Sequence, residues 1–140
     1  MAVSMLVKRL EQYFPDRVLP ADCPSRIVLD HVTSRWGVLV LVALARGTLR
    51  WGEVRRAVEG VSEKMLAQTL QTLVRDGLVH REALPVVPPH VEYSLTPLGE
   101  GLVERLIPLV EWLAEHAPAI VADQPPAARS PASRARPRQT

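Results

Sequence analysis

Cysteine is almost absent from this 140-residue chain, because Cys23 is the only one. A single thiol cannot form a disulfide within the chain, which excludes a small secreted scaffold held together by disulfides. The first residues also lack the basic, apolar and small-residue order of a secretory signal. We therefore expect a cytoplasmic location.

Long apolar runs are missing as well. The longest one, Trp36–Ala45, has about half the length that a helix needs to cross a bilayer. Charged or polar side chains precede it at Asp30, His31 and Arg35. The run predicts a buried core helix, and no membrane partner is expected.

Motifs of metal binding and catalysis are not found either. The four histidines show no pair at metal-ligand spacing, and Cys23 offers no second thiolate, so neither a metal site nor a cofactor is expected. The sequence has no Gly-rich phosphate loop, nucleophile elbow or paired-carboxylate motif. These absences argue against an enzyme.

Positive charge is concentrated in parts of the chain. The formal net charge is +2, but residues 121–140 hold four arginines (Arg129, Arg134, Arg136 and Arg138) against one acid. Residues 24–82 carry nine basic and six acidic side chains, whereas residues 83–120 carry one and five. The central segment is therefore the positively charged part of the body, and local charge there matters more for a nucleic-acid partner than the overall balance.

The chain is long enough for one small domain with flanking arms. Residues 1–22 predict an N-terminal dimerisation helix followed by a proline-rich connector. Residues 23–120 predict the domain itself, ending in a long helix that starts near Pro97 and has an apolar stripe. Residues 121–140 are rich in Arg and Pro without apolar periodicity, which predicts a disordered tail.

Within the domain, two helices with a break at Gly60 are followed by a pair of strands. A short helical segment spans Arg50–Val58, and Ser62 is placed to cap a longer helix that runs to about Asp76. The inward positions of this second helix include Met65, Leu66, Leu70 and Leu73. Two strand-like runs, residues 78–83 and 91–95, then predict a β-hairpin. Trp36, Trp51 and Trp112 fall on inward positions and predict core residues, with an effector cavity as the alternative for one of them.

This order predicts a fold that is mainly α with a small β-hairpin, the winged helix-turn-helix, in which the second of two braced helices enters a DNA major groove. The residues predicted to contact DNA from this helix are Ser62 as its cap and Lys64, Gln68, Gln71, Thr72 and Arg75. Phosphate contacts from the flanking elements and the wing are predicted for Arg50, Arg55, Arg56, Arg81 and His90. The alternative is that the polar side of this helix is an ordinary solvated face.

Several short segments also resemble the HxlR-type winged-helix transcription regulators, which are relatives of the MarR type. They are Cys23-Pro24, Arg35-Trp36, residues 50–56 (RWGEVRR), residues 60–66 (GVSEKML), residues 76–79 (DGLV), residues 87–96 (VPPHVEYSLT) and Glu111-Trp112. The resemblance implies a bacterial DNA-binding homodimer, a recognition helix over residues 62–76, and a wing that touches the DNA backbone.

The chain departs from the pattern of these regulators at three positions. Their recognition helices commonly carry arginine where this chain has Thr69 and another basic residue near Gln71, and arginine often stands where His90 does. Each change removes a phosphate or guanine contact. We therefore expect modest affinity and an altered site sequence.

Cys23 precedes Pro24 at the start of a predicted helix, where a thiol becomes more reactive. The resemblance implies a redox or electrophile sensor at this position, acting through an intersubunit bridge or an adduct. The alternative is a small side chain that packs the helix start.

The apolar stripes of the N-terminal and C-terminal helices predict a homodimer formed by these helices. Such a dimer is expected to bind an inverted repeat in double-stranded DNA as a transcriptional regulator, with repression favoured and a small-molecule effector as a further partner. The alternative function is a winged-helix protein-interaction module that has lost DNA binding.

Overall fold

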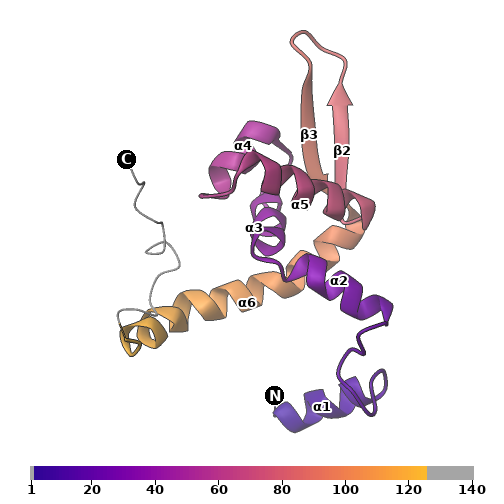
Figure 1. The fold of residues 1–140 in the computed structure, drawn as a ribbon, viewed down its shortest axis with the longest axis vertical. Coiled ribbons are helices and arrows are strands. Elements are labelled where there is room, and N and C mark those ends of the chain that lie inside the picture. Colours follow the sequence, from indigo (N-terminus) through magenta and orange to yellow (C-terminus); the bar gives the residue numbers. More distant parts are fainter. Residues whose placement is uncertain (1, 126–140) are drawn as a thin grey trace, which may run out of the picture. The chain divides into compact units, whose positions relative to one another are not determined.

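The structure, a computed structural model, describes residues 2–125 as six helices and three short strands (Figure 1). The elements in chain order are α1 (Val3–Glu11), α2 (Pro24–Val32), α3 (Arg35–Leu44), β1 (Leu49–Arg50), α4 (Trp51–Ala57), α5 (Glu63–Arg75), β2 (Val79–Leu84), β3 (His90–Leu95) and α6 (Pro97–Ala122). The predicted class, mainly α with a small β-hairpin in a winged helix-turn-helix, is confirmed.

The predicted tail, residues 121–140, starts within the last turn of α6. Its four arginines lie outside the described residues.

The core lies between α3 and α5. Val40, Leu41 and Leu44 on α3 are at most 1% exposed, and α3 packs against α5. Ser34 caps α3 by accepting a hydrogen bond from the Gly37 N–H at 3.1 Å. The apolar run that predicted a buried helix therefore forms the centre of the domain.

The sheet contains one strand more than the sequence predicts. β2 and β3 form the predicted hairpin, which is antiparallel with Val79 opposite Leu95 and Leu84 opposite His90. β1 adds to the other side of β3, so that the strand order is β1-β3-β2. Arg50 therefore belongs to a strand and caps α4, and the predicted helical segment begins one residue later. Two residues are too few to show the alternation of a strand, so β1 is recognised only by its pairing with β3.

The start of α6 is fixed to the turn between α5 and β2. The Thr96 hydroxyl donates to the Gly77 carbonyl at 2.6 Å and accepts from the Gly99 N–H at 3.0 Å. Gly99 approaches the chain so closely that a Cβ there would overlap the Leu78 carbonyl oxygen. These contacts hold the first turn of α6 against the end of α5.

Two apolar side chains predicted to face inward are exposed in the single chain. Met65, in the first turn of α5, is 40% exposed. Trp112 is 50% exposed. It lies in the second compact unit, which begins at Glu104, and its ring stacks on His116 with centroids 4.5 Å apart. For these two residues the prediction of core positions is wrong within one chain.

No single helix within residues 2–125 is both long and apolar enough to span a bilayer. The bent pair α2 and α3, with 74° between its helices, reaches the necessary length and composition only when the two are taken together.

Candidate nucleic-acid interface

The best-formed candidate element is α5, which has defined ends. The Ser62 side chain accepts a hydrogen bond from the Met65 N–H at 3.1 Å, so the predicted N-cap is confirmed. At the other end, Gly77 has φ +76°, a conformation that glycine adopts without steric cost. Leu66, Leu70 and Leu73 are at most 2% exposed and fix the inner side of the helix.

The opposite side of α5 carries a polar stripe, defined here as Lys64, Gln68, Gln71 and Arg75. All four side chains are exposed. Their spacing of four, three and four residues keeps them within a narrow arc, since each residue turns an α-helix by about 100°. Thr72 lies at the edge of this arc and is half-buried. The structure therefore brings together five of the predicted recognition residues on one helix.

Thr69, where the resemblance implies an arginine, does not extend this stripe. Its hydroxyl donates to the Met65 carbonyl at 2.7 Å, one turn earlier in the same helix. A hydroxyl bonded in this way is turned back onto the backbone. The polar stripe consequently contains only two cationic side chains.

α4 is tied to the start of α5 by an ion pair. Arg55 Nη1 donates to Glu63 Oε1 at 2.9 Å, and both side chains remain about half or more exposed. Arg56, by contrast, forms no ion pair with another described residue. The role of Glu63 was not predicted, because its pairing with Arg55 depends on the angle between two helices and no spacing rule contains that angle.

The two predicted phosphate contacts of the wing, Arg81 and His90, lie on opposite faces of the β2–β3 hairpin. In the β2–β3 register, Arg81 lies opposite Tyr93, whereas His90 lies opposite Leu84. Because side chains alternate along a strand, Arg81 shares a face with Tyr93 and His90 belongs to the other face. Arg81 is exposed although Tyr93 is only 7% exposed. The structure therefore does not bring Arg81 and His90 together.

Arg50 lies on the same sheet as His90. Arg50 is opposite Glu92 across the β1–β3 pair, and Glu92 is also opposite Glu82 on the other side. A cation beside two carboxylates is favourable, since opposite charges across strands attract. Arg50 therefore has acidic neighbours that compete with a phosphate for it.

Cys23 lies away from α5, at the N-cap of α2. It is half-buried, and Pro24 occupies the first position of the helix as predicted. Its carbonyl accepts from the Arg26 and Ile27 N–H groups at 3.1 and 3.4 Å. The backbone of Cys23 is thus fixed by the first turn of α2.

These elements define a winged helix-turn-helix protein. α4 braces α5, the capped helix that carries the polar stripe, and the β2–β3 hairpin forms the wing (Figure 1). β1, which precedes α4, pairs with this hairpin. The chain belongs to the HxlR-like helix-turn-helix family, because residues 31–120 match the model of that family. The resemblance identified in the sequence is therefore confirmed.

Relatives and solved structures agree with this assignment. YtfH of Escherichia coli (strain K12), named as an uncharacterized HTH-type transcriptional regulator, is 61% identical over 101 residues, which cover 72% of this chain and 80% of that protein. The structure of ytfH from Salmonella typhimurium is 56% identical, with a TM-score of 0.71 over 76% of this chain and 95% of that one. The redox regulator HypR in its oxidized form is 35% identical, with a TM-score of 0.62 over 66% and 96%.

Proposed function

We propose that this protein regulates transcription by inserting α5 into a major groove of double-stranded DNA. The observation that carries the proposal is the polar stripe of α5. It offers cations and amides at groove-compatible spacing on a helix whose ends are both fixed. Gln68 and Gln71 have the donor and acceptor groups that read base edges, whereas Lys64 and Arg75 suit guanine or phosphate. The family membership supports a regulator that is not an enzyme.

The active form in this proposal is a homodimer. Val3, Leu6, Val7 and Leu10 of α1 are each more than 40% exposed, and α1 has no buried residue. Leu109, Trp112 and Leu113 of α6 are also exposed. Apolar stripes of this kind need covering, and a second copy covers both at once. A two-fold dimer places its recognition helices about 34 Å apart and so binds an inverted repeat.

The regulator acts as a repressor in the cytoplasm, where bacterial DNA lies. A small dimer bound across a promoter occupies DNA that a polymerase needs. Cys23 is a candidate sensor, because it stands at the helix start that joins the connector to the domain, and HypR, a structural relative, is named a redox regulator. A small-molecule effector is the second route by which DNA affinity is controlled.

Selection from a random DNA library with the purified full chain tests the function. An enriched palindrome with half-sites one helical turn apart is the expected result. Light scattering at micromolar concentration should report a dimer, and a monomer would contradict the proposed symmetry.

The second candidate function is a protein-interaction module on the same fold. Thr69 favours it, because its hydroxyl is bonded to Met65 where the resemblance implies an arginine. If no palindrome is enriched while the dimer is intact, the interaction module becomes the better explanation.

A further inference from the structure

The ion pair between α4 and α5 lies beside the polar stripe. Arg55 on α4 donates from Nη1 to Glu63 Oε1 at 2.9 Å. Glu63 is the first residue of α5 and the only acidic residue within that helix. Its side chain is 69% exposed and that of Arg55 is 48% exposed, and a pair so exposed to water contributes little to stability. Both side chains are therefore accessible to a ligand that approaches α5.

Glu63 flanks the polar stripe at its N-terminal end. It directly precedes Lys64, and since each residue turns an α-helix by about 100°, its side chain leaves the helix on the side of α4. In helix-turn-helix proteins the N-terminal residues of the recognition helix contact base edges. A groove that receives Lys64 therefore has the Glu63 carboxylate at its floor or its wall.

The Glu63 carboxylate keeps one oxygen unused. Oε1 is bonded to Arg55, whereas Oε2 accepts no hydrogen bond within residues 2–125. The cap of α5 does not need it, because the Ser62 hydroxyl accepts from the Met65 N–H. Arg55 has further N–H groups, since a guanidinium group carries five, and it can meet a phosphate while it holds Glu63. The pair thus presents an oriented acceptor next to a cation.

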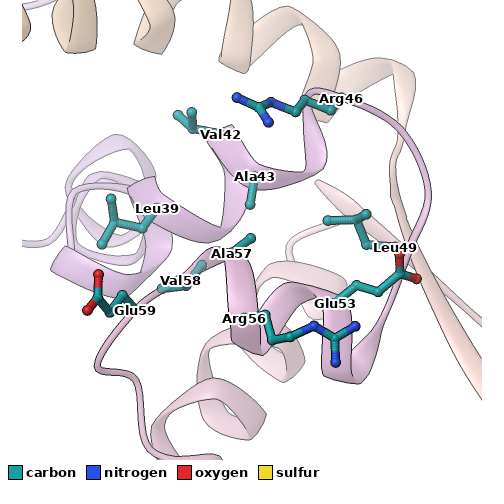
Figure 2. Close-up of a pocket in the computed structure, with 10 residues that line it drawn as sticks. All are labelled: Leu39, Val42, Ala43, Arg46, Leu49, Glu53, Arg56, Ala57, Val58 and Glu59. Carbon is teal, nitrogen blue, oxygen red and sulfur yellow. The ribbon is translucent and has the colours of Figure 1, made fainter.

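The neighbouring charged residues do not join this pair. Arg56, the next residue of α4, lines a hollow of about 700 Å3 beside α3, as does Glu59 of the turn between α4 and α5 (Figure 2). Neither Arg55 nor Glu63 lines that hollow. Glu59 is exposed like Glu63 but lies toward Leu39 of α3 (Figure 2). It is therefore a control of equal charge outside the polar helix.

The four bases differ in what their major-groove edges offer to a carboxylate. Guanine and thymine present only acceptors there, which repel it, and adenine presents its N7 acceptor beside its N6 donor. Cytosine presents the N4 amino donor alone. The phosphates also repel a carboxylate that no donor meets. A carboxylate at this place therefore favours cytosine and lowers the affinity for other sequences.

We propose that Glu63 is a specificity-determining residue that reads a cytosine in each half-site, with Oε2 accepting from the cytosine N4–H. Arg55 is its positioning residue, because it holds the carboxylate through Oε1. The inference rests on the proposed function and adds to it one defined base and the residue that selects it. The bond to the cytosine is charge-assisted and so belongs to the stronger class of hydrogen bonds.

Fluorescence anisotropy measures this reading, with the selected site and its variants carrying each of the four base pairs at each half-site position. The wild-type chain should favour cytosine at one position by about tenfold, as expected for one charge-assisted hydrogen bond. Glu63→Gln should lose the preference for cytosine over adenine, since glutamine pairs with adenine through two hydrogen bonds. Glu59→Gln removes the same charge and should keep the preference. Circular dichroism checks that both variants are folded.

A modified base tests the N4–H directly. N4-methylcytosine still pairs with guanine but offers no free N4–H in the groove. Placed at the read position, it should weaken the wild-type chain about tenfold, as the wrong base does. Glu63→Ala has no acceptor there and should bind the methylated and unmethylated sites with equal affinity.

A double-mutant cycle tests the positioning role of Arg55. Arg55→Gln should weaken all sequences, because a phosphate contact is lost, and should also lower the ratio of affinities between cytosine and the other bases. In the Glu63→Gln background the same change should leave that ratio unaltered, since no carboxylate remains to be held. A ratio that falls equally in both backgrounds would show that Arg55 acts independently of Glu63.

The remaining outcomes separate this inference from the proposed function. If the wild-type chain and Glu63→Gln enrich the same palindrome from a random library, Glu63 reads no base and the inference alone fails. It also fails if Glu63→Gln changes the affinity for all sequences by the same factor as Glu59→Gln. If the wild-type chain enriches no sequence, the proposed function fails and this inference fails with it.

Discussion

The His31 imidazole donates from Nδ1 to a carboxylate oxygen of Asp76 at 2.7 Å, which joins α2 to the C-cap of α5. The two side chains are only 33% and 15% exposed. Asp76 also donates its backbone N–H to the Thr72 carbonyl at 2.9 Å. The C-terminal end of α5 is thus held by α2, the helix that begins directly after Cys23.

Replacing His31 with alanine should therefore lower the free energy of unfolding by about 1–2 kcal/mol, because a partly buried carboxylate loses its partner. Urea denaturation measures this. The matched control is Asp30→Ala, which removes only an exposed pair with Arg26 at 4.0 Å and should cost less than about 0.5 kcal/mol. Equal losses in the two variants would show that the His31 contact is no stronger than a surface pair.

Two glycines at the start of α6 should respond to alanine in opposite directions. A Cβ on Gly99 would overlap the Leu78 carbonyl oxygen, whereas a Cβ on Gly101 would meet no atom within 4 Å. We expect Gly99→Ala to destabilise the protein by about 1–3 kcal/mol, as overpacking does. Gly101→Ala should stabilise it by about 0.5–1 kcal/mol, since alanine is the better helix former. Thermal unfolding of both variants checks the two signs together.

The elements predicted correctly are those long enough to show a regular spacing of apolar residues. The spacing of Leu66, Leu70 and Leu73 identifies the buried side of α5, and Ser62 marks its start, because a cap needs a side chain of a particular type. β1 escaped prediction, since Leu49 and Arg50 form a strand only by pairing with Tyr93 and Glu92. Strand pairing between distant residues is a tertiary property, and no local pattern contains it.

The candidate site was also predicted only in part, because some of its contacts depend on tertiary structure. The polar stripe of α5 follows from helical spacing alone. The Arg55–Glu63 and His31–Asp76 pairs depend on how helices cross, so composition and spacing give no indication of them. Trp112 shows the opposite error: an apolar position on a helix was assigned to the core of one chain, although half of its surface is exposed there.

Ser62→Ala should lower stability by about 1 kcal/mol, because the Met65 N–H loses its acceptor at the start of α5. Ser62→Asp keeps an acceptor and should restore the wild-type value. Ser25→Ala is the control, since Ser25 lies in the first turn of α2 and its side chain makes no hydrogen bond within residues 2–125. A loss in Ser25→Ala as large as that in Ser62→Ala would argue against a specific cap.

Oxidation tests the sensor role proposed for Cys23. Hydrogen peroxide should convert the chain to a disulfide-linked dimer or a thiol adduct, visible on a non-reducing gel, and should change its affinity for the selected DNA. Cys23→Ser should give neither effect and should bind DNA like the reduced protein. Without any dimer or adduct, and with operator binding unchanged by peroxide, Cys23 is a packing residue.

Gln68 and Arg81 should separate base reading from phosphate binding. Gln68 lies in the polar stripe, so Gln68→Ala should change the preferred base at one position of each half-site, with a discrimination loss of about 1–3 kcal/mol. Arg81 lies on the wing, exposed on the same sheet face as Tyr93, and Arg81→Ala should weaken all DNA sequences alike. The slope of its salt dependence should also fall by about one unit for each phosphate that is no longer neutralised.

Arg17→Ala, in the connector, is the charge-matched control for general electrostatic attraction. Fluorescence anisotropy with the selected site and a scrambled site, at several salt concentrations, measures both quantities; if Gln68→Ala weakens the two sites equally, α5 does not read bases through this residue.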